Sequence, residues 1–265
     1  MNTLPSLFVS HGAPLFAIDA GSTGPALRAW AQAHPKPSSI VVMSPHWMAR
    51  TPTVMSTPAP QTWHDFGGFP PELYQLQYPA PGNPALAQEV LALLQAAGIE
   101  ATSDSRRPFD HGTWVPLLHL YPDADVPVVQ VALPAHWGPA QVYTLGRALR
   151  PLREQGMLLL GTGSMTHNLS EFFGGEREPA RYVIDFSRWV EDRIARGDTA
   201  ALLDYRRQAP HAERAHPTED HFLPLFFALG AAADGARPDY LSREVRYGML
   251  AMDAFAMEDA RVPAV

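Results

Sequence analysis

The sequence has 265 residues, a formal net charge of -7 and no cysteine. A chain of this length can bury a substantial core without covalent staples. The acidic balance and the lack of any Lys/Arg run argue against the basic face that nucleic-acid binding requires. Without cysteine, disulfides, thiolate zinc sites, iron–sulfur clusters and cysteine nucleophiles are excluded, so His, Asp and Glu must carry any metal chemistry.

No targeting or membrane-spanning segment is visible. Residues 1–8 have neither a basic region nor a long apolar region, and no apolar run is long enough to span a bilayer. We therefore expect a cytoplasmic protein that binds neither membranes nor nucleic acid. We find no repeat, low-complexity tract or linker, and we expect a single catalytic domain over residues 1–265.

Short apolar runs alternate with amphipathic stretches along the chain, which predicts an α/β fold. Apolar runs closed by Gly, Ser or Pro are typical of buried strands, and Asn83 and Pro84 before an amphipathic stretch indicate a helix start. We expect a mostly parallel central sheet with helices on both faces. The predicted strands cover residues 7–10, 40–44, 53–56, 126–133, 157–160 and 245–252, the last a candidate antiparallel strand, and the predicted helices cover 25–33, 84–97, 139–155, 180–196 and 223–229.

Residues 58–84 form an irregular segment that is rich in Pro, Gly and aromatic residues. Long irregular segments are uncommon inside compact domains, and those that occur are often functional. We interpret this segment as a wall or lid of a binding pocket.

Three of the apolar runs lead into a histidine, namely His11, His46 and His167. In open α/β sheets, ligands bind beyond the carboxyl ends of the strands. If these strands are parallel neighbours, the three imidazoles meet at one place, and imidazole suits Zn, Cu, Fe and Ni. The alternative is three unrelated loop histidines that bond backbone carbonyls.

A fourth candidate ligand, His221, lies at the predicted start of the helix that contains Pro224. His216 competes with it, because five residues on a helix would separate the two side chains. Glu219 and Asp220 are candidate ligands or partners of a ligand, although acidic residues are common in a first helical turn anyway.

Two histidines have an aspartate as a sequence neighbour, in Asp110-His111 and His64-Asp65, which is consistent with positioned acid/base histidines. Gly112, which follows His111, permits unusual backbone geometry there. The glycine-rich stretch 161–164 has no Walker lysine, so a phosphate cradle there is weakly supported. His136 is left out of the candidate site. We expect structural or surface roles for His34, His119 and His211.

Together these motifs resemble the DOPA 4,5-dioxygenase type of class III extradiol ring-cleavage dioxygenases, which is related to the catalytic subunit of protocatechuate 4,5-dioxygenase. The resemblance covers nearly the whole chain, in order. It rests on Ser10-His11-Gly12-Ala13-Pro14, Ser44-Pro45-His46-Trp47, His64-Asp65-Phe66-Gly67-Gly68-Phe69-Pro70, Tyr78-Pro79-Ala80-Pro81-Gly82, Asp110-His111-Gly112, His167-Asn168 and His216-Pro217-Thr218 through His221.

The resemblance implies one non-haem Fe(II) per chain in the active form, with zinc as an alternative bound metal. By it, His11, His46 and His221 match metal ligands. His167 matches a fourth ligand or the catalytic acid/base, and His111 matches a second catalytic histidine near the substrate. One departure is visible, since many members have Pro-Glu before the last histidine, where this sequence has Glu219-Asp220.

The implied activity is the opening of a small, DOPA-like catechol ring with O₂. We predict Trp47, His64 and Phe66 as substrate contacts, because aromatic walls pack on a catechol ring and exclude water. Two other classes stay open at this point. One is a zinc-dependent hydrolase of an amide or ester, since similar sites serve several chemistries. The other is a metal-binding protein without catalytic activity.

Overall fold

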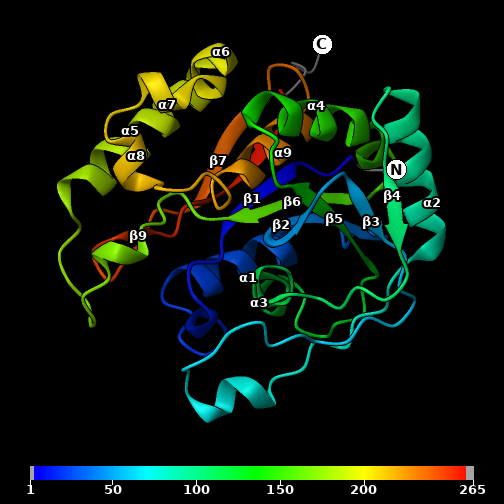
Figure 1. Cartoon of the computed structure of the whole chain (residues 1–265), viewed down its shortest axis with the longest axis horizontal. Helices are drawn as coiled ribbons and strands as arrows, with labels where there is room; N and C mark the ends of the chain where they lie inside the picture. Colours follow the sequence, from blue (N-terminus) through cyan, green and yellow to red (C-terminus); the bar gives the residue numbers. More distant parts are fainter. Residues whose placement is uncertain (1–2, 261–265) are drawn as a thin grey trace.

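An eight-stranded sheet forms the centre of the protein, with strand order β4-β3-β5-β2-β6-β1-β10-β7 (Figure 1). The computed structural model describes residues 3–260, so both ends of the predicted 1–265 domain lie outside the described residues. The strands are β1 (Ser6–Ser10), β2 (Ile40–Ala49), β3 (Thr53–Met55), β4 (Thr102–Asp104), β5 (Val128–Pro134), β6 (Leu158–Gly163), β7 (Arg237–Ser242) and β10 (Ala254–Glu258).

The central strands are parallel, as predicted. β5, β2, β6 and β1 are parallel neighbours, and β3 and β4 are parallel to each other at one edge. Antiparallel pairing joins β3 to β5, β1 to β10 and β10 to β7. The prediction of a mostly parallel α/β sheet is therefore confirmed, and its antiparallel part lies at the β7 edge and around β3.

The predicted strand at 245–252 is wrong. This segment forms a separate hairpin of β8 (Val245–Arg246) and β9 (Leu250–Ala251). Tyr247 and Gly248 both have positive φ, so the chain turns back on itself in the middle of the predicted strand. The strand that pairs antiparallel with β1 is instead β10, which follows the hairpin.

Helices cover both faces of the sheet, as expected (Figure 1). Successive strand residues point to opposite faces, so Phe8 packs in one core and Leu7 and Val9 pack in the other. One core includes side chains of α2, α4, α5 and α9, and the other includes side chains of α1 and α3. The helices are α1 (Thr23–Ala33), α2 (Pro84–Ala96), α3 (His111–Leu120), α4 (Pro139–Leu149), α5 (Arg181–Arg196), α6 (Thr199–Leu203), α7 (Tyr205–Gln208), α8 (Ala212–Ala215) and α9 (Leu223–Ala231).

Local signals explain where several helices begin and end. The Asn83 side chain accepts a hydrogen bond from the Leu86 amide at the start of α2. The predicted helix over 139–155 ends as an α-helix at Leu149 and continues as a 3₁₀-helix to Gln155, because Pro151 has no amide hydrogen to donate. Among the described residues, no helix is long and apolar enough to cross a bilayer.

Glycines in β6 bring α9 directly onto the sheet. A Cβ on Gly161 would lie 2.1 Å from the carbonyl oxygen of Pro224, and one on Gly163 would lie 2.2 Å from that of His221. Only glycine allows so close a backbone approach. The glycine-rich stretch therefore seats the start of α9 against the end of β6, and this places His221 near the carboxyl ends of the central strands.

Candidate metal centre

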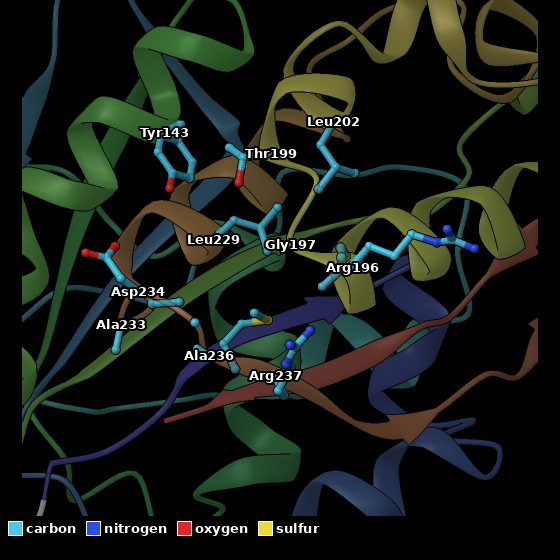
Figure 2. Close-up of a pocket in the computed structure, with 14 residues that line it drawn as sticks. Tyr143, Arg196, Gly197, Thr199, Leu202, Leu229, Ala233, Asp234, Ala236 and Arg237 are labelled. Carbon is cyan, nitrogen blue, oxygen red and sulfur yellow. The ribbon is translucent and has the colours of Figure 1, made fainter. Parts of the chain in front are cut away.

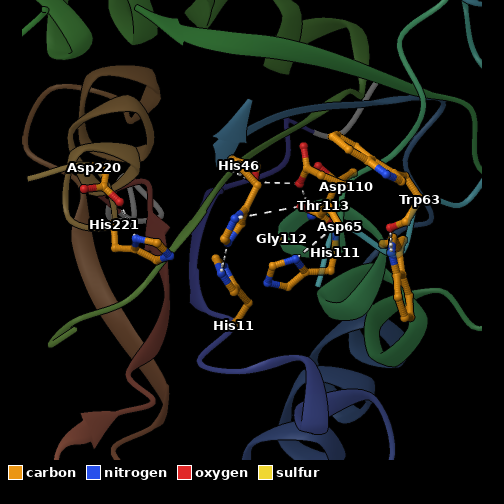
Figure 3. Close-up of polar contacts among 12 residues, drawn as sticks. His11, His46, Trp63, Asp65, Asp110, His111, Gly112, Thr113, Asp220 and His221 are labelled. Carbon is orange, nitrogen blue, oxygen red and sulfur yellow. Dashed lines mark hydrogen bonds and ion pairs between the residues drawn. The ribbon is translucent and has the colours of Figure 1, made fainter. Parts of the chain in front are cut away.

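Three histidines that are far apart in the sequence meet at the carboxyl ends of the central strands (Figure 3). His11 follows β1, His46 lies in the last part of β2, and His221 precedes α9 by two residues. Ligand nitrogens of the three lie within 4.8 Å of one another. The structure thus brings together the three residues that the sequence matched to metal ligands.

His46 owes its position to an irregularity in β2. The sequence predicted that this strand ends at Ser44, but it continues to Ala49 with a register shift between Ser44 and Met48. Pro45 cannot donate to the strand ladder, which favours such an interruption. His46 therefore projects from an interrupted part of the strand and not from the loop after it.

The hydrogen bonds of His11 determine which of its nitrogens is free. The hydroxyl of Thr162 donates to the carbonyl oxygen of Gly112 at 2.8 Å, so its oxygen accepts from Nδ1–H of His11 at 3.0 Å. The lone pair of neutral His11 is therefore on Nε2. Burial lowers the pKa of His11 well below its ordinary value, so the ring is neutral at neutral pH.

His221 is held in the same way by its sequence neighbour. Its Nδ1 lies 2.5 Å from a carboxylate oxygen of Asp220, and because a carboxylate only accepts, Nδ1 carries the hydrogen. Burial lowers the pKa of His221 to about 3, and burial together with nearby His111 lowers that of His46 to about 4. The three imidazoles are neutral at neutral pH, which is the form that binds metal.

The geometry fits one cation. Nε2 of His11 and Nε2 of His46 are 3.0 Å apart. Two nitrogens about 2.1 Å from one ion in tetrahedral or octahedral geometry are separated by about 3.0–3.4 Å. A hydrogen on one nitrogen satisfies this contact without metal, and a cation would replace it. Three protein ligands leave further coordination positions for substrates, as in open catalytic sites.

A second group, formed by His46, Asp65 and His111, also has its candidate ligand atoms within 4.8 Å of one another. It has the composition of the two-histidine, one-carboxylate site of non-haem iron oxygenases. One oxygen of Asp65, however, already accepts hydrogen bonds from the backbone amide and Nδ1 of His111, at 2.9 and 3.0 Å. In the three-histidine group, by contrast, an ion replaces only the hydrogen shared between Nε2 of His11 and Nε2 of His46.

Gly112 has a different role from the one predicted. It lies in α3 and is absent from the residues with positive φ, so it provides no unusual backbone conformation. A Cβ at this position would lie 2.3 Å from Oγ of Ser44, 2.8 Å from Cδ2 of His46 and 3.2 Å from Cε1 of His11. The glycine is needed for space, because α3 packs directly against two of the histidines.

His167 lies beside the three-histidine group and not within it. Its ring stacks on that of His221, with centroids 3.6 Å apart and planes 2° apart. It belongs to neither set of described residues whose ligand atoms are close enough to share one ion. Burial lowers its pKa, with Asp220 acting in the opposite direction.

The three predicted substrate contacts have different neighbours in the structure. The ring of Phe66 meets that of His111 edge-on, with centroids 5.6 Å apart, and the ring of His64 lies 5.8 Å from Phe66. Trp47 is buried against the guanidinium of Arg107, whose carbon lies 4.9 Å from the ring centroid. The aromatic segment 58–84 therefore forms a wall beside His111, with Phe66 nearest to it.

Other polar candidates have structural partners. Buried His216 contacts the carbonyl oxygen of Met165 through Nε2 at 2.8 Å, and burial lowers its pKa to about 3. Glu219 accepts a hydrogen bond from the hydroxyl of Tyr205. His119 contacts a backbone carbonyl oxygen, in agreement with its expected structural role. The fold thus places His221, and not His216, in the three-histidine group.

Of two supporting residues, Thr162 was not identified from the sequence, and Asp110 was expected to position His111 but bonds other partners. Thr162, which orients His11, lies in the glycine-rich stretch, where only the glycines drew attention. Asp110 caps α3 and accepts from the hydroxyl of Ser44 and from Arg107 and Gln130. Its carboxylate therefore ties the start of α3 to β2. The Asp-His dipeptide was the available signal for it.

A cavity of about 280 Å³ lies at the opposite end of the strands (Figure 2). Met257 lines it and pairs with Ser6 at the start of β1, whereas His11 follows the end of β1. Tyr143, Thr199 and Asp234 are among the other residues around it. This cavity is therefore separate from the histidine centre.

Comparison with known proteins identifies the family of the chain. Residues 6–252 match the family of the catalytic LigB subunit of aromatic ring-opening dioxygenase. A Beta vulgaris protein named 4,5-DOPA dioxygenase extradiol is 35% identical over 258 residues, which is 96% of each chain. An Escherichia coli K12 protein of the same name is 36% identical over 255 residues, with 94% of this chain and 93% of that one covered.

A solved structure also matches over most of its length. The crystal structure of an uncharacterized Escherichia coli K12 protein superposes with a TM-score of 0.78 at 30% identity and covers 96% of this chain and 99% of that one. The LigB family implies an aromatic substrate, O₂ and a non-haem iron, and the three-histidine group is a suitable donor set for that metal. The chain therefore belongs to the LigB family and is an extradiol, aromatic ring-opening dioxygenase.

Proposed function

We propose that the protein opens the ring of a small, DOPA-like catechol with O₂, using one Fe(II) held by His11, His46 and His221. The observation that carries the proposal is the group of three imidazoles that share one site at the ends of the central strands. The DOPA-like substrate is supported by the relatives in Beta vulgaris and Escherichia coli, which are named 4,5-DOPA dioxygenase extradiol.

Bound Fe(II) supplies the Lewis acidity and the redox chemistry of ring opening. The protein must move protons, because a catechol hydroxyl loses a proton on binding and protons return as the ring opens. We assign this task to His167, which is next to His221 and whose pKa is lowered by burial, so that it is a neutral base at neutral pH.

His111 faces the same site with its other nitrogen. Its Nδ1 is bonded to Asp65, which leaves Nε2 as an acceptor for a substrate hydroxyl. Phe66 stands edge-on to this ring, and with His64 it forms a wall that keeps water from the substrate. Trp47, which follows His46 in the chain and packs on Arg107, is the third proposed substrate contact.

The test is to load metal-free protein with Fe(II) under anaerobic conditions and then add air with a panel of catechols. The expected result is O₂ consumption and a coloured ring-opened product, with DOPA among the best substrates. Parallel loading with Zn(II) should give no O₂ consumption, because Zn(II) has no redox chemistry. Zinc-dependent hydrolysis of esters or amides, without O₂ uptake on any catechol, would favour the hydrolase instead.

A further inference from the structure

The carboxylate of Asp65 connects two histidines of the centre (Figure 3). One oxygen accepts from the backbone amide of His111 at 2.9 Å and lies 3.0 Å from Nδ1 of the same residue. The other oxygen is 3.9 Å from Nδ1 of His46. The Asp65 side chain is only 8% exposed, so these contacts are formed in a site that largely excludes solvent.

The direction of the hydrogen bond follows from the chemistry of the two groups. An ionised carboxylate can only accept, so the hydrogen of neutral His111 is on Nδ1 and its lone pair is on Nε2. The second contact, from the backbone amide of His111, fixes the carboxylate relative to the first turn of α3. Asp65 therefore sets both the ring orientation and the tautomer of His111.

We propose that Asp65 is a positioning residue that holds His111 in the Nδ1–H tautomer, so that Nε2 accepts a hydrogen bond from a substrate hydroxyl. The part that concerns the substrate rests on the proposed function. The other oxygen of Asp65 places a negative charge beside His46, in a centre whose three proposed ligands are all neutral. At 3.9 Å this contact is too long for a hydrogen bond, so Asp65 adds a charge near His46 without orienting its ring.

Asp220 provides an internal comparison. It contacts Nδ1 of His221 at 2.5 Å, which leaves Nε2 of His221 directed at the centre. Asp65 makes the same contact with Nδ1 of His111 from a different part of the chain. The two carboxylates thus hold two imidazoles in the same tautomer from two sides of the centre.

The position of Asp65 also connects the aromatic wall to the histidines. It lies between His64 and Phe66, whose rings form that wall, while its own carboxylate bonds to α3. A displacement of this segment would change the orientation of His111. Asp65 therefore links the aromatic wall, which encloses the proposed substrate, to His111, which accepts the hydrogen bond of the substrate.

The alternative role for Asp65 is direct metal ligation together with His46 and His111, which form the second group described above. Ligation through the bonded oxygen would cost both hydrogen bonds to His111. The positioning role keeps them, and the two roles predict different results when Asp65 is replaced.

The first test uses metal-free protein and needs no substrate. Asp65→Ala and Asp65→Asn are compared with the wild type by ¹⁵N NMR of the histidine rings at mildly alkaline pH, with the His111 signals assigned by their loss in His111→Gln. We expect His111 as the Nδ1–H tautomer in the wild type and in Asp65→Asn, whose amide oxygen still accepts. In Asp65→Ala we expect a large population of the Nε2–H tautomer. An unchanged tautomer in Asp65→Ala would overturn the proposal.

The second test measures iron content and kinetics of the loaded enzyme. We expect Asp65→Ala to keep about one Fe(II) per chain and to lose about 10–100-fold in kcat, with a smaller change in KM and partial recovery in Asp65→Asn. Loss of iron from both variants would make Asp65 a ligand and overturn the positioning role. Asp198→Asn, which changes a carboxylate that caps α6, is the matched control and should match the wild type.

These tests separate the two proposals. If the wild-type enzyme consumes no O₂ with any catechol, the proposed function fails, while the NMR result still decides whether Asp65 orients His111. A melting temperature is recorded for each variant, and Asp65→Asn, which preserves the size of the side chain, decides the result if Asp65→Ala does not fold.

Discussion

The rings of His167 and His221 lie parallel, with centroids 3.6 Å apart and planes 2° apart. Two stacked imidazoles at this distance cannot both be protonated without strong repulsion, and burial already lowers the pKa of each. The contact places His167 beside a proposed ligand while leaving its own nitrogens available for proton transfer. The contact therefore supports a role in proton transfer for His167 and a role as metal ligand for His221.

Replacing His167 tests this difference. We expect His167→Ala to lose about 10²–10⁴-fold in kcat, the usual contribution of a general acid/base, and to keep its iron. Single-turnover kinetics and metal analysis of the same preparation measure both quantities. If iron content falls together with activity, His167 is a ligand, as one form of the family resemblance implied.

Replacing a proposed ligand should instead remove both the iron and the activity. We expect His221→Ala to lose iron binding and, as a consequence, all measurable ring opening. Loss of a partner that only orients a ligand typically weakens metal affinity by about 10–100-fold, so loss of the ligand itself should exceed that range. Competition with a chelator measures the affinity. His136→Ala, which changes an exposed histidine, is the control, and equal affinity in the two variants would contradict the assignment.

Gly112→Ala should displace the proposed ligand His46, because the new Cβ would lie 2.8 Å from its ring. Overpacking of this kind typically costs about 1–3 kcal/mol in the free energy of unfolding, and here we also expect weaker iron binding. Denaturant unfolding and iron titration measure the two effects.

Two other glycines provide controls for this substitution. Gly146→Ala meets the backbone of α9 and should destabilise the fold without a direct effect on iron affinity, whereas Gly67→Ala has open space around it and should be neutral. Equal iron affinity in Gly112→Ala and Gly67→Ala would contradict the packing argument.

The buried carboxyl of Asp253 should make stability depend on pH. Burial first, and then the nearby charge of Glu191, raise its pKa from 3.8 to about 7, against the effect of Arg243. Between these values the folded chain holds a proton that the unfolded chain releases. The contribution of this group to the free energy of unfolding therefore falls as pH rises, by at most about 1.4 kcal/mol per pH unit.

The corresponding measurement is urea unfolding of metal-free protein across this pH range. We expect Asp253→Asn to be more stable than the wild type above pH 7, with the difference shrinking toward acid pH as the wild-type carboxyl becomes protonated. Asp239→Asn, at an exposed position in β7, serves as the control. A difference between Asp253→Asn and wild type that does not change with pH would refute the prediction.

The sequence by itself determined the α/β class, most of the central strands and the family. Apolar runs closed by turn residues are local patterns, and burial on both faces of a parallel sheet requires them. The same runs placed His11, His46 and His167 after or within central strands that are parallel neighbours. His221 came from the resemblance, since local pattern did not separate it from His216.

Tertiary structure decided the choices that depend on contacts between distant segments. The glycines of β6 let α9 approach and place His221, not His216, at the centre. Thr162 and Asp65 contact histidines 151 and 46 residues away, so local spacing does not show which histidine each one orients. The turn at Tyr247 and the close packing around Gly112 also depend on the tertiary structure. A local pattern predicts which face of an element is buried, whereas the fold determines which residues lie against that face.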